Sequence, residues 1–157
     1  MIESIQTFAD SFPDWLGWAG VLLVSAIPFV ESYFGAVIGV AIGLNPVLAI
    51  LMAIIGNVIS MLALVYGAGA LRDRATKNRT TEVTPKRRRL KRMFDRFGVP
   101  GVSLLGQTVL PSQITSMAMV GFGANRNAVA VWQIISIILW GVVFGVLATL
   151  GINLALR

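Results

Sequence analysis

The stretch "AIPFVESYFGAVIGVAIGLNP" at residues 26–46 decides the fold, because it places a proline, a carboxylate and spaced glycines in an apolar segment. Glu31 is the only Asp, Glu, Lys or Arg in residues 15–44. One helix over that whole length would measure about 45 Å, against a hydrocarbon core of about 30 Å. Pro28 removes a backbone donor and disfavours helix at Ile27. We therefore expect a break near residues 28–35.

The composition is typical of a membrane protein, with 56% hydrophobic residues, 13% charged residues and a mean hydropathy of +0.79. Three further stretches carry no charged side chain, and each exceeds the roughly 20 residues that cross a bilayer core. They are residues 47–71, 98–125 and 127–156. We predict a single all-α membrane domain over residues 1–157.

The N-terminal residues 1–14 contain three acidic side chains and no base, which is not typical of a removable signal peptide. We expect them to be retained as an interfacial segment. The chain contains no cysteine and no histidine. This excludes disulfides, the commonest zinc ligands, and catalysis by Cys/His or Ser/His/Asp groups. We therefore expect no cofactor, no metal and no enzymatic activity.

Eleven of the thirteen Lys and Arg residues lie in residues 72–96, which predicts a cytoplasmic loop over residues 72–97. Its second part, "PKRRRLKRMFDRF" at residues 85–97, has apolar residues at helical spacing opposite a basic face. That apolar stripe consists of Leu90, Met93, Phe94 and Phe97. The pattern predicts an amphipathic helix that lies at the membrane interface.

The basic face predicts attraction of anionic lipid headgroups, at about 1 kcal/mol per base near the membrane surface. The candidate residues are Lys86, Arg87, Arg88, Arg89, Lys91 and Arg92. In the simpler alternative, these bases only fix the topology of the chain. Nucleic acid is not an expected partner, because no base-reading pattern accompanies the charge and the charge adjoins apolar segments.

A second break is predicted at Pro111, which has apolar segments on both sides in residues 98–125. The two halves are weakly similar: "GLNPVLAILMAII" from residue 43 aligns with "GANRNAVAVWQII" from residue 123, an offset of 80. We expect a first repeat at residues 15–71 and a second at 98–157. Each would be a re-entrant helical hairpin followed by one transmembrane helix, at 47–71 and 128–156, with the second half inverted.

The charges favour this arrangement, since it places the acidic N-terminus outside and both the basic loop and Arg126 inside. Four simple crossings remain the alternative. The glycines at positions 35, 39 and 43 recur every four residues, and we expect them to permit close contact between helices.

Two breaks inside a membrane predict a polar cavity, because non-helical backbone is tolerated there only beside protein or water. Glu31 would enter it from the first hairpin and Asn57 from the helix that follows. The second hairpin would contribute Gln107, Thr108, Ser112, Gln113 and Thr115. A charged carboxylate in the membrane costs at least about 2.5 kcal/mol, so a proton or a cationic substrate is the expected counterion. Alternatively, a neutral Glu31 bonds to Gln107 or Gln113 as a structural element.

Two segments resemble known families. "IPFVESYFGAVIGVAIGLNP" followed by "IGNVIS" resembles the first half of the small multidrug export proteins, and "MFDRFGVPGVSLLGQTVLPSQIT" is similar to the second hairpin of the DedA superfamily. The resemblance implies a fold of two inverted hairpin repeats and, in the DedA branch, handling of lipid carriers or phospholipids coupled to the proton-motive force. DedA relatives carry arginines near the second tip, where this chain has Gln107 or Thr108 and Gln113 or Ile114. Gly35 and Ala36 stand where export proteins often have Ile-Pro.

From these features we expect a multi-pass transporter of the bacterial inner membrane that couples protons, through Glu31, to movement of a lipophilic or cationic substrate. The first alternative is a flippase or scramblase of phospholipids or polyprenyl-phosphate carriers, and the second is a non-transporting assembly factor. The expected partners are the lipid bilayer, anionic lipids, protons and a second copy of the chain in a homodimer.

Overall fold

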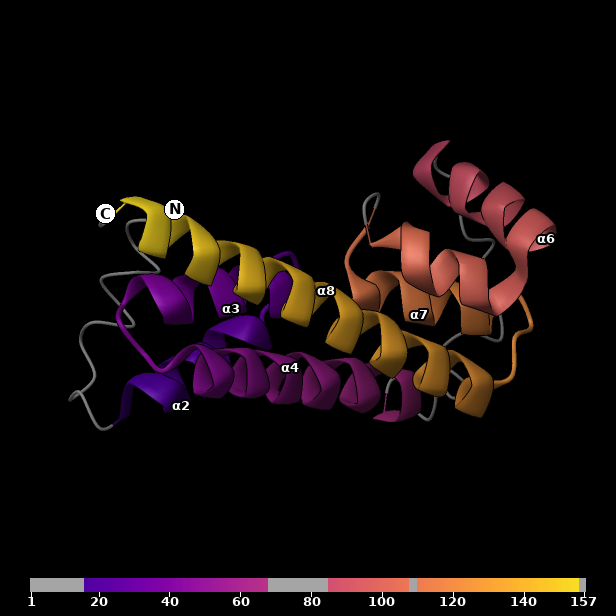
Figure 1. Cartoon of the computed structure of the whole chain (residues 1–157). Helices are drawn as coiled ribbons and strands as arrows, with labels where there is room; N and C mark the ends of the chain where they lie inside the picture. Colours follow the sequence, from indigo (N-terminus) through magenta and orange to yellow (C-terminus); the bar gives the residue numbers. More distant parts are fainter. Residues whose placement is uncertain (1–15, 68–84, 108–109, 156–157) are drawn as a thin grey trace. The chain divides into compact units, whose positions relative to one another are not determined.

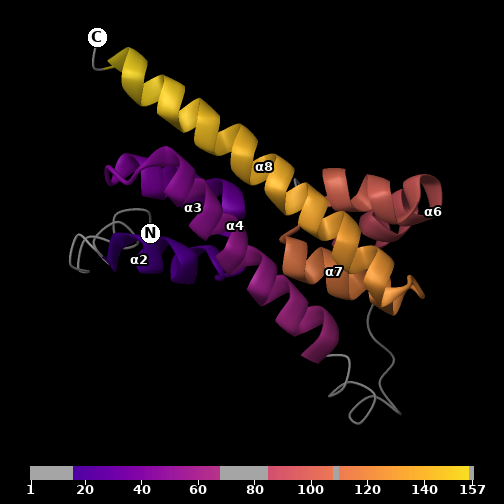
Figure 2. The same cartoon turned by 60° about the horizontal axis from the view of Figure 1, so that its bottom comes forward.

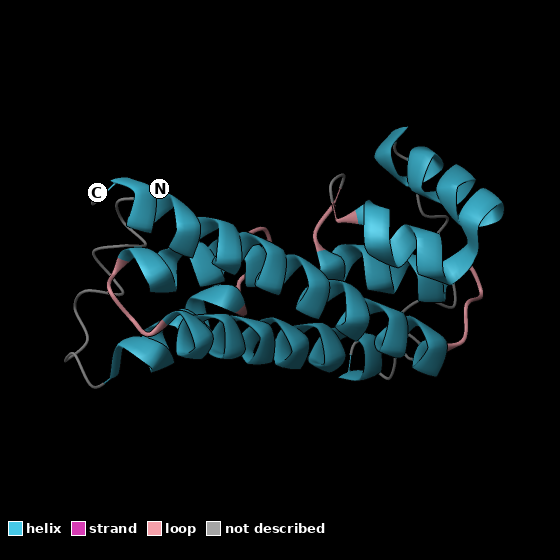
Figure 3. Cartoon of the chain, in the orientation of Figure 1, coloured by secondary structure: helices cyan, strands magenta, loops and turns pink. Residues whose placement is uncertain are grey.

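The computed structural model describes residues 16–67, 85–107 and 110–155, and these residues form helices and short turns (Figures 1 and 3). The helices are α2 (Gly17–Ser25), α3 (Glu31–Ala41), α4 (Pro46–Leu62), the π-helix η2 (Ala63–Gly67), α6 (Pro85–Gly106), α7 (Ser112–Gly121) and α8 (Arg126–Ala155). No strand occurs in the described ranges, which confirms the all-helical prediction for them. The expected interfacial segment 1–14 and the loop residues 72–84 lie outside them.

The chain divides into two compact units. Unit 1 contains the described residues up to Ile59 and those from Ile137 onward, and unit 2 comprises Ser60–Ser136. Unit 1 therefore contains α2, α3, most of α4 and the second part of α8, whereas unit 2 contains the end of α4, η2, α6, α7 and the first part of α8. Each unit thus contains two consecutive helices, α2 and α3 or α6 and α7, together with parts of α4 and α8.

In unit 1, α2 and α3 pack against each other on either side of a break at residues 26–30. The break contains Pro28, as predicted, but it is shorter than residues 28–35 because helix resumes at Glu31. Gly35 therefore lies inside α3, where a Cβ atom would come within 1.7 Å of the Ser25 Oγ atom. The absence of a side chain at Gly35 lets the two helices approach closely, as expected.

The turns that precede α4 and α8 have the same structure. Gly43 and Gly123 both adopt positive φ, 84° and 101°. The Asn45 Oδ1 atom accepts hydrogen bonds from the backbone of Val47 and Leu48, and that of Asn125 accepts them from Asn127 and Ala128. Glycine tolerates positive φ at a helix end, and asparagine caps the next helix. These two turns account for the similarity at an offset of 80 residues (43 to 123).

The expectation that Gly43 permits a close helix contact is wrong. A Cβ atom at Gly43 would meet nothing within 4 Å, whereas one at Gly39 would lie 2.6 Å from the Ala49 Cβ atom. Gly39 thus provides a close helix contact, while Gly43 provides the positive φ of the turn.

In unit 2, α6 bends at Gly98, where φ is 64° and ψ is −166°, so that residues 85–97 and 99–106 form two helical segments. The second segment packs with α7 (Figure 2). Leu90 of the first segment is fully buried, together with Val102, Met119 and Val129. Met93 and Phe94 pack against this cluster, while Phe97 is 49% exposed. The predicted amphipathic helix therefore buries most of its apolar stripe within unit 2.

Two helical stretches, Pro46–Gly67 and Arg126–Ala155, are long and apolar enough to cross a membrane. They correspond to the predicted helices at 47–71 and 128–156. The α4 residues Val47, Leu51, Ile55 and Ile59 are 39–65% exposed and recur every four residues, which places them along one face of the helix. Such an exposed apolar stripe supports the prediction of a membrane protein.

Candidate functional site

Glu31 is the first residue of α3 and is fully buried. Its carboxyl group lies in the first turn of that helix, where the backbone N–H groups and the helix dipole favour negative charge. The backbone around it is strained, because Phe29 and Glu31 both have positive φ, 79° and 59°, although neither is glycine. Strained backbone of this kind persists only where the surrounding structure maintains it, and it is concentrated at functional sites.

Asn57 reaches Glu31 from α4. Its Nδ2 atom donates a hydrogen bond of 2.8 Å to Glu31 Oε2, and both residues are fully buried. The amide can donate to the carboxyl group in either of its protonation states, but it carries no charge and cannot neutralise a carboxylate. The bond therefore helps to fix the position of the carboxyl group against α4.

Neighbouring contacts hold the start of α3 in place. Ser32 Oγ donates a hydrogen bond of 2.8 Å to the carbonyl oxygen of Ile137 in α8. Gly141 lies beside Ser32, because a Cβ atom at Gly141 would be 3.2 Å from the Ser32 Cβ atom. The Glu31–Asn57 pair thus lies within a part of unit 1 to which α3, α4 and α8 all contribute.

The predicted polar residues of the second hairpin lie in unit 2. Ser112, Gln113, Thr115 and Ser116 on α7 are all fully buried. Thr115 Oγ1 donates to the carbonyl oxygen of Leu110 at 3.2 Å, and Ser116 Oγ donates to that of Ser112 at 2.6 Å. Ser112 Oγ donates to Gln113 Oε1 at 3.4 Å. These three bonds all stay within residues 110–116, where they stabilise the start of α7.

Gln107 takes part in a different cluster, which we call the glutamine cluster and which consists of Ser103, Gln107, Gln133 and Ser136. Gln107 Nε2 donates to Gln133 Oε1 at 3.4 Å, and Ser136 Oγ donates to the carbonyl oxygen of Ser103 at 2.7 Å. Sequence reasoning did not identify Ser103, Gln133 or Ser136. The signal that could have found Gln133 and Ser136 is their place as two polar residues in the apolar stretch "VWQIIS" at residues 131–136.

The predicted site residues are divided between the two units. Glu31 and Asn57 are in contact in unit 1, whereas Gln107, Ser112, Gln113 and Thr115 lie in unit 2. Thr108 lies outside the described residues.

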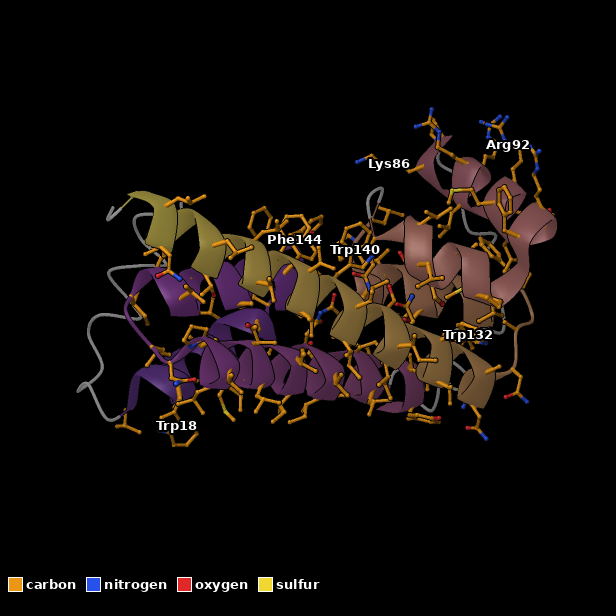
Figure 4. The ribbon with its side chains drawn as sticks, viewed as in Figure 1. Trp18, Lys86, Arg92, Trp132, Trp140 and Phe144 are labelled. Carbon is orange, nitrogen blue, oxygen red and sulfur yellow. The ribbon has the colours of Figure 1, made fainter. Side chains whose placement is uncertain are left out.

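The predicted headgroup-binding residues lie on the first segment of α6. Lys86, Arg88, Arg89, Lys91 and Arg92 are exposed, while the Arg87 side chain is not described. Figure 4 shows the nitrogen atoms of Lys86 and Arg92 pointing away from the helix. Lys91 forms an ion pair with Asp95, and its Nζ atom lies 5.7 Å from the centre of the Phe122 ring. Lys91 is therefore engaged locally, and the basic face consists mainly of the other exposed residues.

Within the described ranges, no group of three His, Cys, Asp or Glu side chains could hold a metal ion. Comparisons of the chain with models of protein families, with curated proteins and with solved structures found no match.

Proposed function

We propose that this chain is a small integral membrane transporter in which Glu31 alternately binds a proton and a lipophilic or cationic substrate. The observation that supports this most strongly is the fully buried carboxyl group of Glu31 at a helix break, held by Asn57 at 2.8 Å. Ionisable groups within apolar segments are costly, and many of them mark proton or substrate pathways.

The proposed mechanism follows from the charge of one carboxyl group. When Glu31 is protonated, its burial costs little, and the surrounding helices favour a closed arrangement. When it is deprotonated, a cation or an opening to water must compensate the charge. A proton and a cationic substrate would therefore compete for Glu31, and this competition couples their movements.

We further propose that α2–α3 and α6–α7 are re-entrant hairpins, related as inverted repeats, in a multi-pass protein of the bacterial inner membrane. The helix breaks at Pro28 and near Pro111, and the matching turns at Asn45 and Asn125, support this arrangement. The resemblance to small multidrug export and DedA proteins agrees with it. A homodimer would bury part of the exposed apolar faces.

The test is proton flux in proteoliposomes that contain a trapped pH dye and are challenged with lipophilic cations. We expect the native protein to release protons and Glu31→Gln, which keeps the shape of the side chain, to abolish the flux. Thr149→Val is the matched control, because the Thr149 hydroxyl bonds only to the backbone of its own helix, at Gly145. Full coupling in Glu31→Gln would refute the proposal.

Lipid translocation is a second candidate, which the exposed basic face of α6 favours. Anionic headgroups would gather at Arg88, Arg89 and Arg92 before they cross the membrane. Replacing these residues and Arg87 by glutamine should cripple the movement of fluorescent anionic lipids but barely change cation flux. The third candidate is a non-transporting assembly factor. It is favoured if the native protein moves neither cations nor lipids, and if partner binding needs the basic loop but not Glu31.

A further inference from the structure

Three buried polar atoms of the glutamine cluster have no hydrogen-bond partner among the described residues. They are Ser103 Oγ, Gln107 Oε1 and Gln133 Nε2. Ser103 and Gln133 are fully buried, and Gln107 is 7% exposed. A buried polar group without a partner loses its hydrogen bonds to water and gains none in return, so three such groups in one cluster call for an explanation.

The residues that carry these atoms are neighbours, because sequence proximity or a hydrogen bond joins each of them to another. Ser103 and Gln107 are four positions apart in sequence, at the end of α6. Gln107 is bonded to Gln133 at 3.4 Å, and α8 also donates to Ser103 through the Ser136 hydroxyl. The residues that carry the three atoms therefore lie together in one part of unit 2.

We propose that this region binds a water molecule. A buried water typically makes about three hydrogen bonds, which matches the number of atoms that lack a partner. It would accept a hydrogen bond from Gln133 Nε2, donate one to Gln107 Oε1, and exchange one with the Ser103 hydroxyl, which can donate or accept.

The assignment of oxygen and nitrogen in the two glutamines does not alter this conclusion. If both amides are turned over, Gln133 donates to Gln107, and one acceptor and one donor again remain without a partner. The ligand must therefore offer both a donor and an acceptor. A bare cation does not fit beside an N–H donor, and no charged side chain belongs to the cluster to balance an anion. Water offers both a donor and an acceptor and therefore fits the chemistry of the cluster.

The experiment is magnetisation transfer from water protons to assigned side-chain amides, measured by solid-state NMR on the full chain in lipid bilayers. We expect the Gln133 amide protons to receive magnetisation nearly as fast as those of Asn45, which lies in an exposed turn. The backbone N–H of Val102, whose residue is fully buried in an apolar cluster, is the dry reference and should lag several-fold.

The matched variant is Gln107→Leu, which keeps Gln133 and removes one of the water's partners. We expect transfer to Gln133 to fall at least twofold in this variant while transfer to Asn45 is unchanged. Ser103→Ala should act in the same direction and provides the test if Gln107→Leu does not fold. Transfer to Gln133 as slow as that to Val102 in the native protein would overturn the proposal. The proposed water site is independent of the proposed transport function. A failure of the proton-flux experiment would leave the magnetisation-transfer result unchanged, and the reverse also holds.

Discussion

The side-chain amide of Asn57 donates a hydrogen bond of 2.8 Å to Glu31 Oε2, and this bond joins the start of α3 to the middle of α4 inside unit 1. Neither residue has any exposed surface. Because 26 positions separate the two residues in sequence, the bond exists only when α4 has folded back along α3 through the turn at residues 42–45. The chemical site and the local fold are therefore interdependent.

Replacing Asn57 by leucine should lower the free energy of unfolding by about 1–3 kcal/mol, since a buried carboxyl group loses a donor. We expect a smaller loss when Glu31 is already leucine, because the group that needs the donor is then absent. A double-mutant cycle from reversible unfolding in mixed micelles compares the cost of Asn57→Leu with Glu31 present and with Glu31 replaced. The two costs should differ by about 0.5–3 kcal/mol. Strictly additive effects would show that the bond contributes nothing to stability.

Replacing glycine by alanine should change the stability of the protein differently at three positions, depending on how closely another helix approaches. A Cβ atom at Gly56 would lie 2.0 Å from the backbone oxygen of Leu22, and one at Gly35 would lie 1.7 Å from Ser25 Oγ. A Cβ atom at Gly151 would meet nothing within 4 Å. Overpacking costs about 1–3 kcal/mol, whereas alanine at an open helical position gains up to about 1 kcal/mol.

Thermal unfolding of the three variants checks this order. Gly56→Ala and Gly35→Ala should lower Tm, and Gly151→Ala should leave it unchanged or raise it. Adding Ser25→Ala should partly restore Gly35→Ala, because the closest atom is then removed. No such rescue is available for Gly56, where the obstacle is backbone. Equal Tm values for all three variants would contradict the packing of α2 against α3 and α4.

The parts of this fold that follow from local chemistry were predictable. Pro28 lies in the break between α2 and α3, and Pro111 directly precedes α7. The similarity between residues 43–55 and 123–135 reflects two turns with the same glycine and asparagine. The contacts between distant segments were not predictable. Asn57 was expected in the same cavity as Glu31, but the hydrogen-bond partners named for Glu31 were Gln107 or Gln113. Only the packing of α3 on α4 shows that Asn57 donates to Glu31. In sequence, Gln133 is distinguished only as a polar residue in an apolar stretch, and its partner Gln107 is identified only by the fold.

The proposed inverted topology predicts opposite labelling at two equivalent positions. Val47 and Asn127 occupy the same place in the two matching turns, and both are exposed. Because the chain lacks cysteine, Val47→Cys and Asn127→Cys each introduce a single thiol. In intact cells, a membrane-impermeant thiol reagent should label Val47→Cys and spare Asn127→Cys. Permeabilised cells are the control and should label both, while external labelling of Asn127→Cys would exclude the inverted arrangement.

Leu90 should anchor the basic segment of α6, because it is fully buried with Val102, Met119 and Val129. Leu90→Ala should cost about 2–5 kcal/mol through the cavity that it leaves. Leu105→Ala is the matched control, since it is the same substitution in the same helix at a side chain that is 50% exposed, and it should cost about 1 kcal/mol.

Trypsin gives a local readout of the same contact, because residues 85–97 contain many Lys and Arg cleavage sites. We expect Leu90→Ala to accelerate cleavage in this segment severalfold, since the helix separates more often from the core of unit 2. Leu105→Ala should cleave at the native rate. Leu90→Ala could instead lower the free energy of unfolding of the whole protein while cleavage of the native state stays as slow as before. That result would show that residues 85–97 do not separate from the rest of unit 2 on their own.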